Sequence, residues 1–179
     1  MESSIPKKTI FLDRDGVINK DIGYLHRINE FQFIDGIFET CKHFLKINYQ
    51  IIIVSNQSGI GRGYYSLEEY NQLTEWMHNQ FNKQGIVILD SLYCPHHPIS
   101  NCNCRKPKPG MLLESKIKHN VCIGRSWMIG DKETDIMAAM NAGIKNTILL
   151  RSHHHSKNKE SNATYVIKSV IDSIKIISD

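Results

Sequence analysis

Short apolar runs alternate along the chain with longer segments in which apolar residues recur every three or four positions. The short runs are rich in isoleucine, valine and leucine, which is typical of strands buried on both faces of a parallel sheet. The longer segments are typical of helices that pack one face against such a sheet. We expect strands at residues 9–12, 50–54, 87–93, 127–129 and 147–150, with a short sixth at 164–167.

Helices are expected between these strands, at 36–46, 66–84, 110–119, 133–142 and 170–177. The second helix is the best defined, because Ser66 and Glu69 match a capping box at its start. Its apolar face is formed by Tyr70, Leu73, Met77 and Phe81. Regular alternation of strands and helices with short connections predicts an α/β fold with a doubly wound, Rossmann-like parallel sheet.

The chain is expected to form one domain, residues 1–179, because it shows no internal repeat and no linker. Two segments, 16–35 and 59–93, are too short to hold a separate lid, so we expect an open active site without a large cap. Residues 152–162 are polar and rich in histidine, which is typical of a surface loop. The three histidines at 153–155 are therefore expected to be solvated rather than to hold a metal.

Two carboxylates, Asp13 and Asp15, follow the first strand directly. Their spacing sends both toward the same side, at the sheet edge where open α/β folds bind ligands. Asp13 could attack a phosphorus atom, and Asp15 could transfer the proton of the leaving oxygen. The alternative is a solvated turn. Matching polar groups further along the chain favour the catalytic explanation.

Those groups follow strands or precede helices, as phosphoryl transfer requires. Ser55 ends the second apolar run, and its hydroxyl can donate a hydrogen bond to phosphoryl oxygens. Lys106 precedes a predicted helix and supplies compact positive charge. Asp131 follows the fourth strand. Together with Asp13 and the main-chain carbonyl of Asp15, it offers oxygen ligands suited to Mg²⁺.

The acidic residue Asp135 has two explanations that the sequence leaves open. It could support the metal ligands from outside their shell. It could equally be an acid in the first turn of a helix, where the helix dipole favours negative charge. Its position four residues after Asp131 is compatible with both.

A second metal site is predicted in the loop after the third strand. Three of the five cysteines lie there beside two histidines. Four nitrogen and sulfur ligands in two close pairs are typical of tetrahedral structural zinc. The loop ends just before Lys106, so its expected task is to hold that cation in place. The ligands chosen are Cys94, His96, Cys102 and Cys104, with His97 able to replace His96.

Composition narrows the cellular setting. A net charge of +4 with scattered lysines suits an anionic small molecule and gives no basic groove for nucleic acid. The apolar runs are strand-length, and the start of the chain has no signal-peptide pattern. We therefore expect a cytoplasmic monomer with no nucleic-acid or membrane partner.

The order of these motifs resembles that of the haloacid dehalogenase-like (HAD) phosphohydrolases. Within them, the pattern is most similar to the heptose 1,7-bisphosphate 7-phosphatases, through residues 13–19, 21–24, 33–36 and 56–63 and the Cys-x-Cys-Arg-Lys-Pro run. The resemblance implies that Asp13 is the nucleophile and Asp15 the proton donor, and that Ser55 and Lys106 stabilise the phosphoryl group. It implies substrate contacts from Asp21, Ile22, Gly23, Tyr24, Ser55, Asn56, Gln57, Ser58, Arg105, Lys106 and Lys132.

The implied reaction removes the C7 phosphate of D-glycero-D-manno-heptose 1,7-bisphosphate, a step toward the nucleotide-activated heptose of surface polysaccharides. Only residues 97–101 separate the two pairs of zinc ligands, which is shorter than in many heptose members and similar to histidinol-phosphate phosphatases. Histidinol phosphate is therefore an alternative substrate. Alternatives of other classes are a phosphatase for nucleic-acid ends and a non-catalytic phosphate-binding module.

Overall fold

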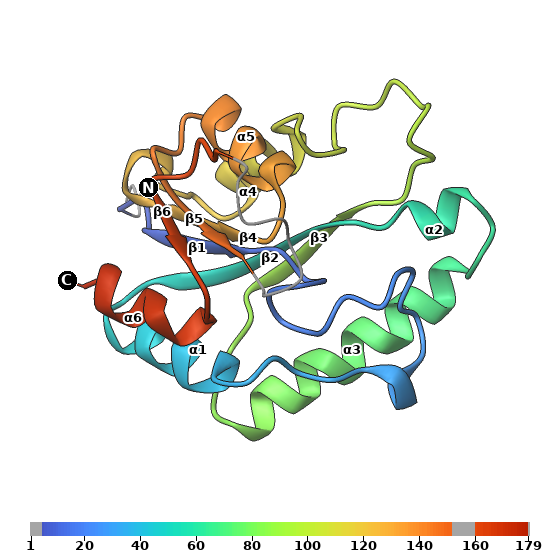
Figure 1. Ribbon diagram of the computed structural model, residues 1–179, viewed down its shortest axis with the longest axis horizontal. Coiled ribbons are helices and arrows are strands. Elements are labelled where there is room, and N and C mark those ends of the chain that lie inside the picture. Colours follow the sequence, from blue (N-terminus) through green and yellow to red (C-terminus); the bar gives the residue numbers. More distant parts are fainter. Residues whose placement is uncertain (1–4, 152–159, 179) are drawn as a thin grey trace.

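A computed structural model describes residues 5–151 and 160–178. Six strands of the described residues form one parallel sheet in the order β3-β2-β1-β4-β5-β6 (Figure 1). The strands are β1 (Thr9–Leu12), β2 (Gln50–Asn56), β3 (Asp90–Cys94), β4 (Trp127–Gly130), β5 (Asn146–Leu150) and β6 (Tyr165–Ile167). The helices are α1 (Ile37–Lys46), α2 (Ser58–Gly61), α3 (Leu67–Lys83), α4 (Gly110–Lys118), α5 (Glu133–Ala142) and α6 (Ser173–Ile176), with 3₁₀ turns at Ile28–Glu30, Ile123–Arg125 and Val170–Asp172.

Helices cover both faces of this sheet, which confirms the predicted fold class. In β1, Ile10 and Leu12 point into a core shared with α1, α3 and the C-terminal segment. Phe11, between them, points to the opposite face, into a smaller core with α4 and α5. Figure 1 shows α4 and α5 above the sheet and α1, α3 and α6 below it. The period of two in a strand therefore supplies apolar side chains to both layers.

The chain reverses its direction across the sheet between β1 and β4. It runs outward from β1 through β2 to β3 and then returns to place β4 beside β1. Leu12 pairs with Ile129, and the Asp13 N–H donates to the Ile129 carbonyl oxygen at 3.0 Å. Loops after β1 and β4 therefore leave the sheet side by side, at the kind of switch point where open α/β sheets bind ligands.

Most predicted elements occur within one to three residues of their expected bounds. The capping box of α3 is present: the Ser66 hydroxyl accepts from the Glu69 N–H, and the Glu69 carboxylate accepts from the Ser66 N–H. Strand β3 begins at Asp90 rather than at 87, because its pairing with β2 starts there, with Asp90 opposite Ile52. The sequence analysis also missed α2, whose four residues are too few to show a helical period.

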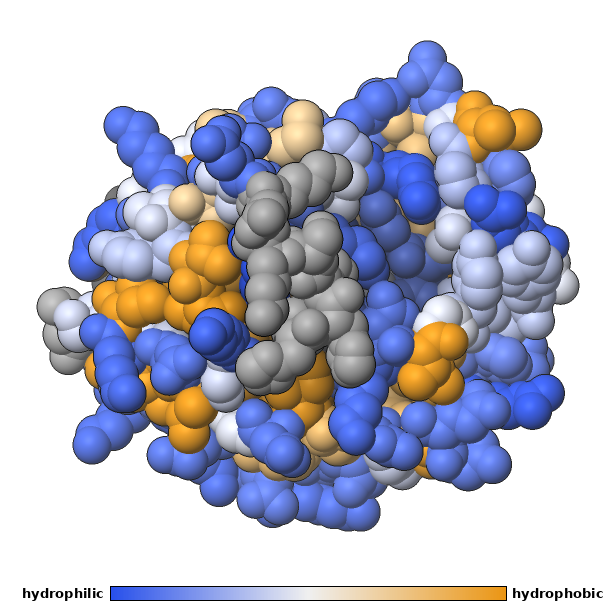
Figure 2. Space-filling model, viewed as in Figure 1, coloured by the Kyte–Doolittle hydropathy of each residue, from blue (hydrophilic) through white to orange (hydrophobic). Residues whose placement is uncertain are grey.

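The two segments that could have held a lid are filled by a 3₁₀ turn and by helices α2 and α3, and α3 packs its apolar face into the core. Residues 13–36 hold one 3₁₀ turn, and residues 57–89 hold α2 and α3. Among the described residues, no helix is long and apolar enough to cross a membrane. On the face shown in Figure 2, the surface is largely hydrophilic, and apolar residues gather in small separate groups. The histidines at 153–155 lie outside the described residues.

Candidate active site

Three carboxylates gather where β1 and β4 end. Asp13 follows β1, Asp131 follows β4, and Asp135 lies in the first turn of α5. All three residues are buried, and one oxygen from each lies within 4.8 Å of those of the other two. With the buried Lys106, they form what we call the acidic centre.

The Lys106 ammonium group bridges two of these carboxylates. Its Nζ lies 2.7 Å from Asp13 Oδ1 and 2.5 Å from Asp135 Oδ1, and it donates to the Val54 carbonyl oxygen at 2.7 Å. Asn56 holds the lysine main chain, because its side-chain amide accepts from the Lys106 N–H and donates to the Lys106 carbonyl oxygen. The amide of Asn56, expected to contact substrate, is thus engaged in placing Lys106.

Glycine allows the catalytic loop to approach the second carboxylate. Gly16 has a φ of +92°, and a Cβ added there would lie 2.3 Å from Asp131 Oδ2. Any side chain would therefore push the loop after β1 away from the loop after β4. The glycine in the Asp-x-Asp-Gly motif is required by this close contact.

The acidic centre holds more negative than positive charge. Burial raises the pKa of Asp13 well above its usual range; Lys106 opposes this shift, and the carboxylates of Asp135, Asp131 and Asp15 add to it. Burial likewise raises the pKa of Asp131 to about 6. Each shift reflects the cost of placing an anion in this buried, acidic group.

A divalent cation fits this group of residues. Asp131 Oδ1 is buried and has no hydrogen-bond partner among the described residues. The donors are carboxylate oxygens from two loops that meet at one point, and hard oxygen ligands of this kind suit Mg²⁺. Bound positive charge would also remove the unfavourable burial of Asp13 and Asp131 as anions.

Asp15, two residues after Asp13, is held by donors on several sides. Arg14 Nε and Nη2 lie 3.2 and 3.0 Å from its Oδ1, and Nη2 is also 3.0 Å from Oδ2. Asn19 donates to Oδ1 and Gln57 to Oδ2, both at 3.0 Å. Arg14 is itself fixed by a bond to the Leu25 carbonyl oxygen. These contacts keep the carboxylate close to, but separate from, the acidic centre.

The expected substrate segment 21–24 forms one rim of the site. Lys132 Nζ lies 3.0 Å from Asp21 Oδ2 and 3.6 Å from Asp131 Oδ2, so it connects the rim to the acidic centre. The Gly23 N–H donates to Asp21 Oδ1, which closes a tight turn. Ile22 and Tyr24 remain largely exposed on this turn. The segment thus presents two exposed apolar side chains beside a charged pair.

The remaining predicted contacts come from β2, α2 and the loop before α4. Ser55 is buried at the end of β2, where its hydroxyl accepts a short hydrogen bond from the Gln57 amide. Ser58 is the first residue of α2, which begins two residues after β2 ends. Arg105 is half-buried, and its Nη1 has no hydrogen-bond partner among the described residues. Arg105 therefore retains a donor for a ligand.

A second cluster lies in the loop after β3. Cys94 Sγ is 3.5 Å from His96 Nδ1 and 3.6 Å from Cys102 Sγ, and His96 Nδ1 is 3.2 Å from Cys104 Sγ. We call these four residues the cysteine–histidine cluster. A tetrahedral zinc ion with Zn–S distances of about 2.3 Å and Zn–N distances of about 2.0 Å separates its ligand atoms by roughly 3.5–3.8 Å. Two of the three distances fall in this range and the third, from His96 to Cys104, is shorter by about 0.3 Å, so the four side chains are gathered closely enough to hold one ion.

The other histidine of this loop is turned elsewhere. His97 Nδ1 accepts from the Ile99 N–H at 3.3 Å, and the residue is not part of the cluster. The loop is anchored at both ends, because the Gly61 N–H donates to Pro95 and the Gly110 N–H donates to Asn103. A Cβ added at Gly61 would lie 2.5 Å from the main-chain nitrogen of His97, so α2 packs directly on the loop.

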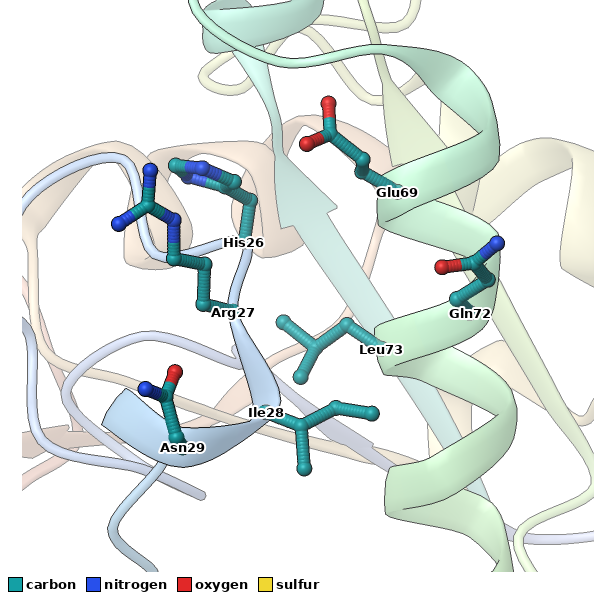
Figure 3. A pocket seen from close by; sticks show the side chains of 7 residues that line it. All are labelled: His26, Arg27, Ile28, Asn29, Glu69, Gln72 and Leu73. Atoms are coloured by element: carbon teal, nitrogen blue, oxygen red, sulfur yellow. The ribbon is translucent and has the colours of Figure 1, made fainter.

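A separate surface pocket of about 430 Å³ lies between residues 26–29 and helix α3 (Figure 3). Its lining residues are His26, Arg27, Ile28, Asn29, Glu69, Gln72 and Leu73. None of them belongs to the acidic centre. The pocket is connected to the site through His26. Its ring stacks on Tyr65, with centroids 5.1 Å apart, and Tyr65 is hydrogen-bonded to Gln57.

Comparison with known proteins identifies the family. The HAD-hydrolase-like family model matches residues 103–175. A relative from Helicobacter pylori, D-glycero-beta-D-manno-heptose-1,7-bisphosphate 7-phosphatase, is 44% identical over 169 residues, covering 94% of this chain and 97% of the relative. This chain belongs to the heptose 1,7-bisphosphate 7-phosphatase family. The resemblance noted from the motifs is thereby confirmed, and the protein is a phosphatase of the HAD superfamily.

Members named for either anomer of the sugar are similar to this chain. A D-glycero-alpha-D-manno-heptose-1,7-bisphosphate 7-phosphatase from Photorhabdus laumondii is 41% identical over 163 residues, or 87% of this chain and 89% of the relative. A crystal structure of D,D-heptose 1,7-bisphosphate phosphatase from B. bronchiseptica, complexed with magnesium and phosphate, superposes with a TM-score of 0.84. It is 26% identical and covers 94% of this chain and 97% of that one.

Sequence reasoning missed several contacts within the site. Asp135 does lie in the first turn of α5, one of the two roles considered, and its carboxylate accepts from the Lys132 N–H there. Its ion pair with Lys106 was not foreseen. Arg14 lies between the two acids of the Asp-Arg-Asp-Gly motif, and this position could have suggested its ion pair with Asp15. Tyr65 gave no comparable signal, because only the fold brings it to Gln57.

Proposed function

We propose that this phosphatase removes the C7 phosphate of D-glycero-D-manno-heptose 1,7-bisphosphate through a phosphorylated Asp13. The observation that carries the proposal is the buried Asp13–Lys106 pair beside Asp131, with Asp15 held next to it. A carboxylate at a strand end can attack phosphorus, and the paired ammonium offsets phosphate charge. The names of the related enzymes supply the sugar.

The reaction proceeds in two displacements at phosphorus. An Asp13 oxygen forms a bond to phosphorus as the bond to the sugar oxygen breaks, and Asp15 gives its proton to that oxygen. Water then attacks the same phosphorus, Asp15 takes one of its protons, and the Asp13–phosphorus bond breaks to release phosphate. Ser55 and Lys106 donate hydrogen bonds to the phosphoryl oxygens during both displacements.

Magnesium is the proposed cofactor of the acidic centre. The side chains of Asp13 and Asp131, with the main-chain carbonyl of Asp15, would hold it. When bound, it neutralises the negative charge that the carboxylates and the phosphate bring together. Its support is the unpartnered Asp131 oxygen and the shared oxygen donor set.

Zinc is the proposed ion of the cysteine–histidine cluster, with a structural role. Four protein ligands leave no open position for substrate, which is typical of structural zinc. Cys104 immediately precedes Arg105 and Lys106, so the closed loop would hold both cations against the phosphate. None of the five cysteines forms a disulfide, which supports our proposal of a reducing, cytoplasmic location. We also propose that the enzyme is a monomer.

The substrate is bound at two separated anionic ends. The C7 phosphate lies at the acidic centre, and the C1 phosphate extends toward the rim, where Arg105 and Lys132 can meet it. An open site must rely on such remote contacts to position the reacting group. The anomer is left to experiment, because the relatives include enzymes named for each.

A substrate panel tests the proposal. We expect kcat/KM for one heptose 1,7-bisphosphate anomer to exceed that for histidinol phosphate and for phosphorylated DNA ends by about tenfold or more, or about 1.4 kcal/mol. EDTA should stop turnover and added Mg²⁺ should restore it. Arg105→Ala should reduce kcat/KM for the bisphosphate more than for p-nitrophenyl phosphate. A preference for histidinol phosphate would show that the short loop between the two ligand pairs was the better guide to substrate.

A further inference from the structure

Tyr65 is a buried tyrosine that has no assigned role in the reaction. It lies between α2 and α3, and its ring occupies space left by a glycine: a Cβ added at Gly59 would be 2.0 Å from its Cε1 atom. The His26 ring covers it from outside, at an interplanar angle of 9°. Figure 3 shows His26 on the loop that faces α3. The ring is therefore enclosed by packing on two sides.

The hydroxyl of Tyr65 connects to the catalytic groups through one side chain. It donates to Gln57 Oε1 at 2.5 Å. Gln57 Nε2 then donates to Asp15 Oδ2 at 3.0 Å and forms a short hydrogen bond to Ser55 Oγ. Gln57 is only 2% exposed, so water has little access to it. One amide thus lies between the proton-transfer carboxylate and the phosphoryl-contacting hydroxyl.

The two ends of this amide are not interchangeable. A glutamine side chain has one accepting end and one donating end. The NH₂ end of Gln57 faces Asp15 Oδ2 and Ser55 Oγ, so its carbonyl end must face a donor. Tyr65 supplies it, and because burial raises the pKa of Tyr65 to about 12, its hydroxyl keeps its proton at neutral pH. Every polar atom of Gln57 is satisfied in this orientation.

Asp15 Oδ2 accepts from two side chains, Arg14 and Gln57. Arg14 also donates to Oδ1, as does Asn19 Nδ2, so Gln57 is the donor that contacts Oδ2 alone. The Gln57 contact is also the one that Asp15 shares with Ser55. Loss of Gln57 orientation would thus leave Asp15 bound by Arg14 and Asn19 but without the contact that fixes Oδ2 relative to Ser55.

We propose that Tyr65 is a positioning residue: through Gln57, its hydroxyl sets the direction of the Asp15 carboxylate toward the leaving oxygen. The proposal deepens the proposed function, since it rests on Asp15 as the proton donor, but it does not depend on which sugar phosphate is hydrolysed. A residue that acts on proton donation should matter most when the leaving group needs a proton. Alkoxides are poor leaving groups without one, whereas p-nitrophenolate leaves readily as an anion.

The test compares Tyr65→Phe with the unaltered enzyme, both loaded with magnesium, on an alkyl phosphate and on an aryl phosphate. We expect kcat/KM to fall about tenfold to a hundredfold for heptose 1,7-bisphosphate or another primary alkyl phosphate, and less than about threefold for p-nitrophenyl phosphate. The effect should lie in kcat rather than in KM. Tyr49→Phe is the matched control, because Tyr49 is also buried but lies before β2, at the other end of that strand. It should leave both rates unchanged.

A double-mutant cycle separates positioning from general damage. Gln57→Leu should show the same dependence on leaving group, and Tyr65→Phe should add little to it, because the two act in one chain of contacts. Partial unfolding would lower both reactions equally and so would not imitate the expected ratio. Equal losses on alkyl and aryl substrates, no loss on either, or additive losses in the double variant would each overturn the proposal. Failure of the heptose bisphosphate as a substrate would refute the sugar assignment alone.

Discussion

The acidic centre and the cysteine–histidine cluster are two potential metal sites in one chain, built in opposite ways. The acidic centre takes its residues from the ends of β1 and β4, from α5 and from the loop before α4, so only the folded sheet brings them together. The cluster takes all four residues from one loop, between Cys94 and Cys104. The first is buried and uses oxygen atoms. The second is partly exposed and uses sulfur and nitrogen.

This contrast matches a division of labour between chemistry and support. Hard oxygen donors that leave room for phosphate suit Mg²⁺, whereas a closed set of soft donors suits zinc. The sheet already exists without the acidic centre, so a metal there is needed for reaction rather than for folding. The loop brings four ligand side chains together on one short segment, so a metal bound there would contribute folding energy. The two sites should therefore respond differently to single substitutions.

The largest expected effect is that of Asp13→Asn on activity. It removes the nucleophile, and we expect kcat/KM to fall about a thousandfold or more. Stability of the metal-free protein should be kept or increased, because a buried carboxylate whose pKa is raised is replaced by a neutral amide. Steady-state kinetics and thermal unfolding measure the two outcomes. Asp35→Asn is the control, because it makes the same change at an exposed aspartate. Turnover near the unaltered level would exclude Asp13 as the nucleophile.

Cys102→Ser should have the reverse profile, with a large loss of stability and a smaller loss of activity. We expect bound zinc to fall from about one ion per chain to nearly none, and unfolding free energy to fall by about 3 kcal/mol or more. Activity should fall about tenfold, because Arg105 and Lys106 follow the cluster directly.

Elemental analysis and chemical unfolding measure these changes. The control is Cys122→Ser, which alters a half-buried cysteine outside the cluster. An intact metal content in Cys102→Ser, or a metal-free protein with full activity, would contradict a structural zinc site.

The predictability of the two sites differs for the same physical reason. The cluster is visible in the sequence because its ligands are close together, and His96 rather than His97 is the residue that the fold brings to the cysteines. The nucleophile was also recognisable, since Asp13 follows an apolar run that forms β1 as expected. By contrast, the bond from Lys106 to Asp135 joins distant segments, and the bond from Tyr65 to Gln57 depends on how the chain folds around α2. No local period or spacing encodes them.

The same holds for the secondary structure. Elements with a full repeat or a capping signal were predicted nearly to the residue, as for α3, whose Ser66 cap is present. Short elements were missed or shifted because packing determines them. Helix α2 exists where Gly61 contacts the loop after β3, and β3 begins only where its residues pair with Ile52. Tertiary contacts thus define these short elements and boundaries.

Within the acidic centre, Asp135→Asn should have an intermediate effect. It removes one of the two carboxylate partners of Lys106, so the ammonium group is held less firmly, and we expect kcat/KM to fall about tenfold. Glu133→Gln is the matched control, because it removes an acid from the same first turn of α5 without a contact to Lys106. If both variants lose activity equally, the favourable charge of these acids at the start of α5 is enough to explain the loss. The Lys106–Asp135 ion pair would then not be important for the rate.

The smallest expected effect concerns His78, a histidine outside the cysteine–histidine cluster that contacts β3, the strand leading to it. His78 on α3 contacts the Ser91 hydroxyl at 2.7 Å, and β3 continues from there to Cys94. Burial lowers the pKa of His78 below its ordinary value of 6.5. As pH falls through 6.5, the unfolded chain therefore binds a proton before the folded protein does, and stability decreases.

His78→Gln should reduce this decrease between pH 7 and 5 by roughly a few tenths of a kcal/mol, given the partial solvent exposure of the ring. The pH at which zinc is released should not change, because release depends on protonation of the ligands themselves. Chemical unfolding and a zinc-sensitive dye measure the two quantities separately. His43→Gln, whose ring contacts the Ile177 carbonyl oxygen instead of β3, controls for the loss of any histidine. A shifted release pH in His78→Gln alone would show that the cluster depends on β3 as well as on its own loop.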